Sequence, residues 1–282
     1  MAPRFDHIGD HDLDAATKRE LRAVTDGFFE RPLEKAEQFD WETFKRNEAF
    51  KAIMMPSPLF WVLANFERSF TQKLGQQMYE AFGRAVAETN EAVGPAATQH
   101  ACTDLQLSHA AENRIETIIA ELADGDREPD WQQEQAEIRD VASDDTARKS
   151  IGKITWDLWV EDFENGRPLA AEIKTPKPNR DQTMESKRQM LKTVAAYSDR
   201  EEPTPICRYV FPFNPYGSLA DYEWWPAQAF FDVKASDGML IAEDFWDALG
   251  GPGTMDGLFN FLLEESEDNI EKLQALAGDK TL

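Results

Sequence analysis

The sequence predicts an α/β protein with a mixed β-sheet flanked by helices and a mainly helical N-terminal region. Before residue 148, apolar residues recur at intervals of three and four, the period of amphipathic helices. After it, short stretches rich in Trp, Ile and Val alternate in part between apolar and polar, as strands do. We expect three parts within one compact domain: a helical 1–147, an α/β core over 148–235 and a helical 236–282.

The N-terminal region is expected to contain helices separated by proline and glycine. Helical spacing covers residues 13–55, and the two prolines within 55–58 interrupt it. A longer amphipathic helix follows over 63–85. A further helix should begin near Ser108 and close near Gly125. Its inward side chains are expected to be Ile115, Ile118, Ile119 and Leu122. The acidic stretch that follows, up to residue 147, predicts a loop or a short exposed helix.

Strands are expected at 153–162, 169–175 and 206–213, where aromatic and β-branched residues are frequent. Asn165-Gly166 is a strong signal for a hairpin between the first two strands. A helix should cover about 183–197, between the second and third strands.

The C-terminal part should contain a short strand, a turn and two helices. The turn is expected at Asp237-Gly238, directly after the short strand. One helix should start near Ala242, and a closing helix should cover about 255–277.

The chain is strongly acidic, with 53 acidic and 30 basic residues and a net charge of −23. The acid is dispersed rather than gathered in a tail, which favours adaptation to a salt-rich, halophilic cytoplasm. Such a charge argues against passive binding to nucleic acid. Residues 148–192 are the exception, because they hold ten basic and seven acidic residues. DNA contact is therefore expected in this segment.

Composition excludes several classes of protein. No apolar run approaches the ~20 residues needed to span a bilayer. The N-terminus is polar and acidic, without the apolar core of a signal peptide, so a cytoplasmic protein is expected. Cys102 and Cys207 are far apart and outside any CxxC motif. We expect two reduced structural thiols rather than a disulfide or a zinc site.

The candidate chemistry lies in the predicted hairpin. In Glu172-Ile173-Lys174, strand alternation directs Glu172 and Lys174 to one face and Ile173 to the other. Asp157 lies on the preceding strand and can be brought beside them. Carboxylate oxygens, with the backbone carbonyl of Ile173, are suitable ligands for Mg²⁺. Lys174 would neutralise charge that develops on a phosphate during phosphodiester cleavage.

Asp…Glu-x-Lys is a short motif, and an acidic chain contains several by chance, so a surface hairpin with solvated charges is the alternative. Three observations favour the catalytic interpretation. The flanks are apolar, as a buried strand requires, and the local charge reverses sign. The sequence Thr-Pro-Lys-Pro-Asn at 175–179 also ends the strand with polar groups near the candidate site.

The chain resembles a known nuclease superfamily at these positions. Asp157 followed by Glu172-Ile173-Lys174 resembles the PD-(D/E)xK nucleases, with Trp156 where the motif has proline. The string EIKTPKPNRDQ at 172–182 is similar to type II restriction endonucleases of the TdeIII family. Further similarity lies in SFTQKLGQQMYE at 69–80, in NPYG at 214–217 and in EDFWDALGG at 243–251.

The resemblance implies a restriction-endonuclease-like core in which Asp157 and Glu172 bind metal and Lys174 is catalytic. Such nucleases often add a helix acid to the metal site, and Glu80 is the candidate, with an ordinary solvated helix face as the alternative. The expected DNA-binding residues are Lys153, Lys177, Asn179, Arg180 and Gln182, which are of types that bind phosphates or read bases. Tyr216 and Trp224 could stack on bases, although turn and core roles are the alternative.

The implied activity is that of a type II restriction endonuclease. It would cut double-stranded DNA at a short palindromic site as a homodimer that requires Mg²⁺. A partner DNA methyltransferase would protect the host DNA and complete a restriction-modification system. Two rival interpretations are a structure-selective repair or recombination nuclease of the same superfamily, and a DNA-binding module without catalysis.

Overall fold

The computed structural model describes residues 9–73, 77–143, 147–198, 200–235 and 237–279. Contacts between residues group the chain into two compact units, one of 1–82 with 253–282 and the other of 83–252. The sequence analysis divided the chain differently, into 1–147, 148–235 and 236–282, and that division stays a prediction. No helix of the described residues is long and apolar enough to cross a membrane.

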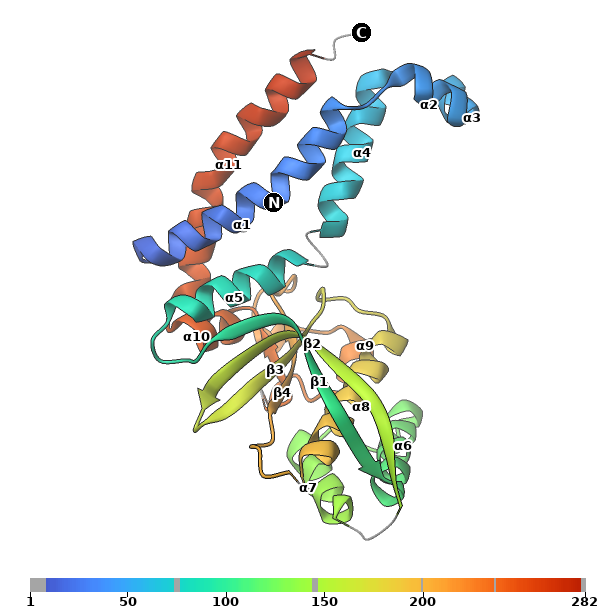
Figure 1. Cartoon of the computed structure of the whole chain (residues 1–282), viewed down its shortest axis with the longest axis vertical. Helices are drawn as coiled ribbons and strands as arrows, with labels where there is room; N and C mark the ends of the chain where they lie inside the picture. Colours follow the sequence, from blue (N-terminus) through green and yellow to red (C-terminus); the bar gives the residue numbers. More distant parts are fainter. Residues whose placement is uncertain (1–8, 74–76, 144–146, 199, 236, 280–282) are drawn as a thin grey trace. The chain divides into compact units, whose positions relative to one another are not determined.

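The larger unit contains one five-stranded sheet with strands in the order β1-β2-β3-β4-β5 (Figure 1). The bounds are β1 Ala96–Ser108, β2 Arg148–Glu164, β3 Arg167–Ile173, β4 Ile206–Phe211 and β5 Met239–Ile241. β1, β2 and β3 pair antiparallel, whereas β3, β4 and β5 pair parallel. The sheet is therefore mixed, and helices flank it, which confirms the predicted fold class.

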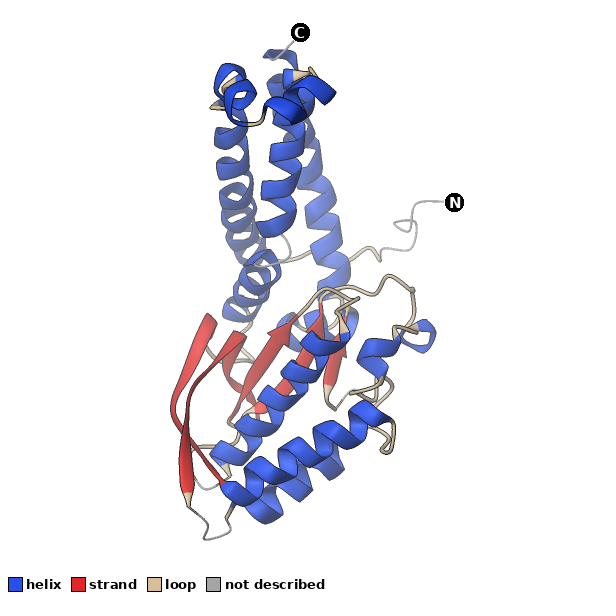
Figure 2. Cartoon of the chain, turned by 90° about the vertical axis from the view of Figure 1, so that its right-hand side faces the viewer, coloured by secondary structure: helices blue, strands red, loops and turns tan. Residues whose placement is uncertain are grey.

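Along the chain, the helices of this unit precede, separate and follow the strands. They are α5 Tyr79–Thr89, α6 His109–Asp124, α7 Trp131–Ala142, α8 Arg180–Tyr197, α9 Trp225–Gln228 and α10 Glu243–Gly250, of which α5 begins in the smaller unit. Figure 2 shows α8 lying across one face of the sheet, and α6 and α7 pack beside it. On α5, Gly83 lies so close to Leu158 of β2 that an added Cβ would be 2.9 Å from its side chain.

The central hairpin and helix α6 follow the sequence prediction closely. Asn165 and Gly166 both have positive φ, at 53° and 73°, as the predicted two-residue turn requires. Helix α6 begins after Ser108, whose side chain caps it, and ends at Gly125 in the left-handed conformation. The four side chains predicted to face inward from this helix are all buried.

The secondary structure differs from the sequence predictions in three places. Strand β1 was not predicted, because its alternation leaves much of one face exposed and its register shifts at bulges. The stretch after Gly125 forms α7, which buries Trp131 and Ile138 rather than remaining an exposed segment. The short edge strand β5 follows the Asp237-Gly238 turn rather than preceding it. Of the predicted helix at 63–85, residues 74–76 lie outside the described part of the chain.

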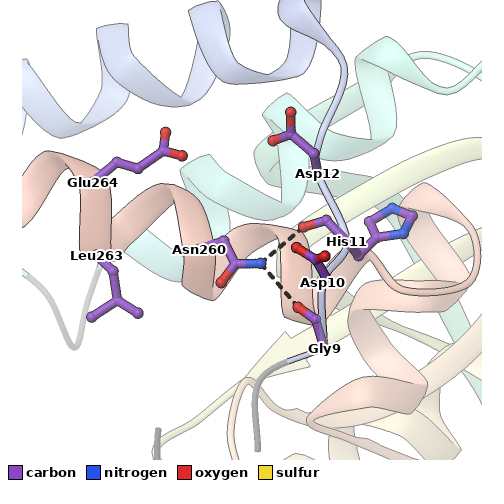
Figure 3. A pocket seen from close by; sticks show the side chains of 7 residues that line it. All are labelled: Gly9, Asp10, His11, Asp12, Asn260, Leu263 and Glu264. Atoms are coloured by element: carbon purple, nitrogen blue, oxygen red, sulfur yellow. Dashed lines mark hydrogen bonds between the residues drawn. The ribbon is translucent and has the colours of Figure 1, made fainter. Parts of the chain in front are cut away.

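The smaller unit is built from helices α1 Ala15–Glu37, α2 Trp41–Asn47, α3 Ala49–Met54, α4 Pro58–Lys73 and α11 Thr254–Asp279. α1 packs against both α4 and α11 and buries Leu21 and Phe28. The chain before α1 is held against α11, because the Asn260 side chain donates to the carbonyls of Gly9 and His11 at 3.0 and 2.9 Å (Figure 3).

Candidate active site

Strand pairing brings the predicted active-site residues together. Leu158 of β2 lies opposite Ala171 of β3, so Asp157 and Glu172 are the next residues along their strands. Trp156 is fully buried, and alternation directs Asp157 to the other face of the sheet. Ile173 is also buried, with 7% exposure, as the predicted inward position requires.

The Lys174 ammonium lies among three oxygen atoms. Its Nζ is 2.6 Å from Glu172 Oε1, 3.1 Å from Asp157 Oδ2 and 3.1 Å from the carbonyl oxygen of Ile173. The Ile173 N–H also donates to Asp157 Oδ2 at 2.8 Å, which fixes the carboxylate. The two carboxylates and the backbone carbonyl named from the sequence thus converge on one cation.

Burial and mutual interaction shift the pKa values of the charged groups in this cluster. Burial raises the pKa of Glu172, and the nearby Asp157 carboxylate adds to the shift, while Lys174 opposes it. Burial alone would lower the pKa of Lys174, but the Glu172 and Asp157 carboxylates outweigh it and raise the pKa. Lys174 therefore stays charged, and its ammonium stabilises two carboxylates that would otherwise repel each other.

Two glutamines that the sequence analysis missed hold these carboxylates. Gln189 of α8 donates from Nε2 to Glu172 Oε2 at 3.3 Å and to the Thr155 carbonyl at 3.1 Å. Gln99 of β1 donates to Asp157 Oδ1 at 3.2 Å. The sequence carried no signal for either residue, because a lone polar residue on a helix or strand is the ordinary surface pattern. Only the tertiary packing reveals their role.

The segment after β3 has a mixed structural role. Asn179 and Gln182 form a capping box at the start of α8, so both side chains are already engaged. Arg180 donates to the carbonyl of Ala123 and lies over Trp225. Lys177 is exposed and its Nζ lies 5.0 Å from the centre of the Tyr216 ring. DNA contact by these residues stays a prediction, and Lys177 is the most available of them.

The basic segment 148–192 is neutralised in part by the fold. Lys187 forms a fully buried ion pair with Glu134. Arg188 and Lys149 pair with Glu116 and Glu112. Other cations of the segment lie nearer the candidate site.

Lys153 and Lys192 line a hollow of about 270 Å³, together with Thr155, Glu185 and Gln189. Gln189 also contacts Glu172, so the hollow adjoins the candidate site.

Glu80, the predicted further metal ligand, lies in the first turn of α5 and is buried. It belongs to the smaller of the two compact units, and its part in the site stays a prediction. Within the described residues, no group of three His, Cys, Asp or Glu side chains could hold a metal ion. At Asp157 and Glu172, the Ile173 carbonyl is a third oxygen close to both carboxylates.

Comparison with known proteins defines the class. The family model described as "Type II restriction endonuclease, HinfI" matches residues 21–265, which is most of the chain. The match spans the sheet and the hairpin that carries Asp157 and Glu172, and it identifies a type II restriction endonuclease. The chain belongs to the HinfI family of these enzymes.

Individual relatives agree with the family. The chain is 26% identical to the type II restriction enzyme HgiCII of Herpetosiphon aurantiacus over 218 residues, 76% of each chain. It is 26% identical to HgiEI of the same organism over 73% of this chain and 72% of that enzyme. It is 22% identical to MjaII of Methanocaldococcus jannaschii over 68% of this chain and 51% of that enzyme. No solved structure matches the chain significantly.

Proposed function

We propose that this restriction endonuclease hydrolyses double-stranded DNA with Mg²⁺ at a site formed by Asp157, Glu172 and Lys174. The observation that supports this most is the convergence of three oxygen atoms on the Lys174 ammonium. The proposal includes membership of the PD-(D/E)xK superfamily and the closer likeness to TdeIII-family enzymes. Both rest on Asp157 and on the string at 172–182.

The donor chemistry of the site fits a divalent metal. Asp157, Glu172 and the Ile173 carbonyl offer only oxygen, which Mg²⁺ prefers, and they already surround one cation. Once bound, Mg²⁺ would polarise the scissile phosphate and lower the pKa of a bound water. A metal held by these atoms would require the Lys174 ammonium to move from its present position.

The protein's own residues would orient and stabilise the reacting groups. Lys174, on its flexible side chain, would donate to a phosphate oxygen and offset the charge that develops there. The Ile173 N–H keeps Asp157 in place, and Gln189 keeps Glu172 in place. These contacts limit the motion of both carboxylates, as a preorganised site requires.

Lys153 and Lys192 are proposed to bind the DNA backbone next to the scissile phosphate. Both line the hollow beside Gln189, which itself contacts Glu172. Lysine is a common phosphate ligand and carries little sequence information. Lys177, with Arg180, Asn179 and Gln182, is proposed to contact DNA further along the duplex. Glu80 is proposed as an additional acid of the metal site.

The biological setting follows from the activity. We propose a homodimer that cuts both strands of a short palindromic sequence, because two-fold symmetry in the protein then matches that of the site. A DNA methyltransferase of the same restriction-modification system would protect the host. The enzyme would act in the cytoplasm, where bacterial and archaeal DNA lies.

Digestion of a sequenced supercoiled plasmid with Mg²⁺ tests this proposal. Discrete fragments whose ends share one short sequence are expected, with no cutting in EDTA. Cutting confined to junctions or flaps would instead indicate a repair nuclease. A mobility shift without any cutting would indicate a DNA-binding module. Either of these two outcomes would contradict the proposed function.

Gln189→Ala should weaken metal binding without unfolding the protein. Gln189 is a positioning residue, because it holds Glu172 rather than touching the substrate. Loss of such an outer contact lowers metal affinity by about 10- to 100-fold. Calorimetric titration with Mg²⁺ and with Ca²⁺ measures the effect, alongside the melting temperature. Gln189→Glu offers no N–H to Glu172 and should not restore binding, and unchanged affinity in Gln189→Ala would contradict the role.

The dispersed negative charge leads us to propose adaptation to a salt-rich, halophilic cytoplasm. Near 1 M salt the Debye length falls to about 3 Å, so repulsion between the acidic protein and DNA is screened. Binding would then depend on base hydrogen bonds and apolar contacts rather than on counterion release. Cleavage measured across KCl concentrations should be greatest at high salt. An optimum below about 0.2 M, near the physiological range, would rule the adaptation out.

A further inference from the structure

The smaller unit carries a group of exposed apolar side chains on α3 and at the start of α4. Among the described residues, most large apolar side chains with high exposure fall within 50–63. We define the α3–α4 patch as Phe50, Ile53, Met54, Met55, Phe60 and Leu63. Phe50 is 86% exposed, Ile53 77% and Met54 84%.

Helical spacing places these side chains on shared faces. Phe50, Ile53 and Met54 are separated by three and four positions, so they lie on one face of α3. Ala52, on another face of the same helix, is buried. Phe60 and Leu63 are likewise three apart on α4. Each helix therefore presents its exposed apolar side chains on one face, and the hydrogen bond from Trp61 to the Met55 carbonyl joins the start of α4 to the end of α3.

An aromatic cluster on α2 and α4 adjoins the patch, since the Trp61 ring lies 5.0 Å from that of Phe60. Phe44 of α2 lies 5.0 Å from Trp61 of α4 and 5.6 Å from Trp41, measured between ring centres. The Trp61 indole also donates to the Met55 carbonyl at 2.9 Å, which fixes the turn between α3 and α4. Because these contacts order the patch in the single chain, little conformational entropy would be lost when a partner covers it.

The size of the patch is that of a protein interface. Taking about 200 Å² for a fully exposed large side chain, the six residues expose on the order of 700 Å². This exceeds the ~300–600 Å² of the largest patch on a typical monomer. It is close to the ~800 Å² that each partner contributes to a standard interface.

The charge around the patch favours a second copy of this chain as the partner. Residues 41–68 contain four basic and three acidic residues, in a chain whose net charge is −23. Two of the acids are paired locally, Glu42 with Lys45 and Glu48 with Lys51. Two copies can therefore meet here without the repulsion that the rest of the acidic surface would impose.

We propose that two copies of this chain associate through the α3–α4 patch, around a two-fold axis that pairs each patch with its counterpart. The proposal rests on the proposed function, because a chain with one Asp157–Glu172–Lys174 cluster needs a second copy to cut both strands together. A two-fold interface is self-complementary, so an apolar patch of near-neutral charge suits it.

Sedimentation equilibrium of the full chain tests the surface. The wild-type protein should sediment with twice the chain mass of 32.1 kDa. Phe50→Gln combined with Met54→Gln should raise the dimer dissociation constant at least about tenfold, because both side chains lie in the patch. The matched control is Leu263→Gln, which changes a 43% exposed apolar residue on α11 of the same unit. It should leave the dissociation constant unchanged.

A cross-linking measurement gives an independent readout that does not depend on the double variant folding well. The native cysteines, Cys102 and Cys207, are both buried, so a maleimide should react with a new surface thiol in preference to them. Ile53→Cys treated with a short bismaleimide should yield a covalent dimer, whereas Leu263→Cys should not.

The outcomes separate this inference from the proposed function. If the protein cuts DNA and its dimer survives the patch substitutions, the α3–α4 patch is not the dimer interface. The proposed function is then unaffected. If the substitutions disrupt the dimer but the protein never cuts DNA, the patch is supported as the dimer interface and the proposed function is contradicted. A wild-type protein that stays monomeric at every concentration would overturn the inference and indicate a different partner for the patch.

Discussion

Lys174→Ala should lower the rate of DNA cleavage by at least about 100-fold, the loss that follows removal of one group aimed at developing charge. In this protein Lys174 is the cation that contacts both Glu172 and Asp157. Its removal deletes no oxygen of the two carboxylates or of the Ile173 carbonyl, and a bound divalent cation would replace the lost positive charge between them. Specific binding of DNA should therefore remain largely intact. Single-turnover cleavage of a plasmid and fluorescence anisotropy with Ca²⁺ measure the two effects separately.

Lys234→Ala is the matched control, since it removes the same charge from an exposed position of the larger unit. It should cleave at the wild-type rate. Retained cleavage in Lys174→Ala would remove this residue from the mechanism. Equal loss of binding and cleavage would assign Lys174 to substrate binding instead.

Removing one partner of the Glu134–Lys187 pair should lower the free energy of unfolding by about 3–5 kcal/mol, the usual effect of leaving a buried charge unpaired. Both side chains have no exposed surface. The Lys187 ammonium also lies 4.8 Å from the Trp131 ring centre and 4.6 Å from that of Phe231. Burial lowers the pKa of Lys187 and raises that of Glu134, so either group alone would tend to lose its charge.

Chemical denaturation of Glu134→Ala and Lys187→Ala measures this effect. Replacing both residues, Glu134→Gln with Lys187→Met, should recover much of the loss, because no charge is then buried alone. The surface pair of Lys149 with Glu112 provides the control, since Lys149→Ala should change stability by less than about 1 kcal/mol. Similar small losses at Lys187 and Lys149 would contradict a structural role for the buried pair.

The active-site hairpin could be predicted because its signals are local. Strand alternation decides which face Glu172 and Ile173 take, and Asn165-Gly166 marks the turn that joins the two strands. The pairing at the site was not predictable in this way, because a register shift between Val160 and Glu164 brings Glu172, rather than Lys174, opposite Asp157. Local patterns also gave helix α6 with its caps at Ser108 and Gly125. In each case the residues that determine the structure are near in sequence to those they position.

The remaining features depend on contacts between distant segments. Strand β1 is defined by pairing with β2, some fifty residues away, so its own sequence pattern is weak. In the sequence, Gln189 is an ordinary polar residue of a helix. Its contact with Glu172 arises only because α8 packs across the sheet. The segment 148–192 holds more basic than acidic residues, but tertiary partners such as Glu134 neutralise part of its positive charge. A sequence count of charge therefore overstates the free positive surface.

If Asp157 and Glu172 hold the catalytic metal, as proposed, a metal bound there will cut the protein backbone next to them when it generates radicals. Fe²⁺ replaces Mg²⁺ in the folded protein, and peroxide then generates hydroxyl radicals at the bound metal. Backbone cuts are expected beside Asp157 in β2 and beside Glu172 in β3. Excess Mg²⁺ and the Asp157→Asn substitution should both suppress these cuts. Cuts confined to other segments, or cuts that Asp157→Asn leaves unchanged, would show that these carboxylates do not hold the metal.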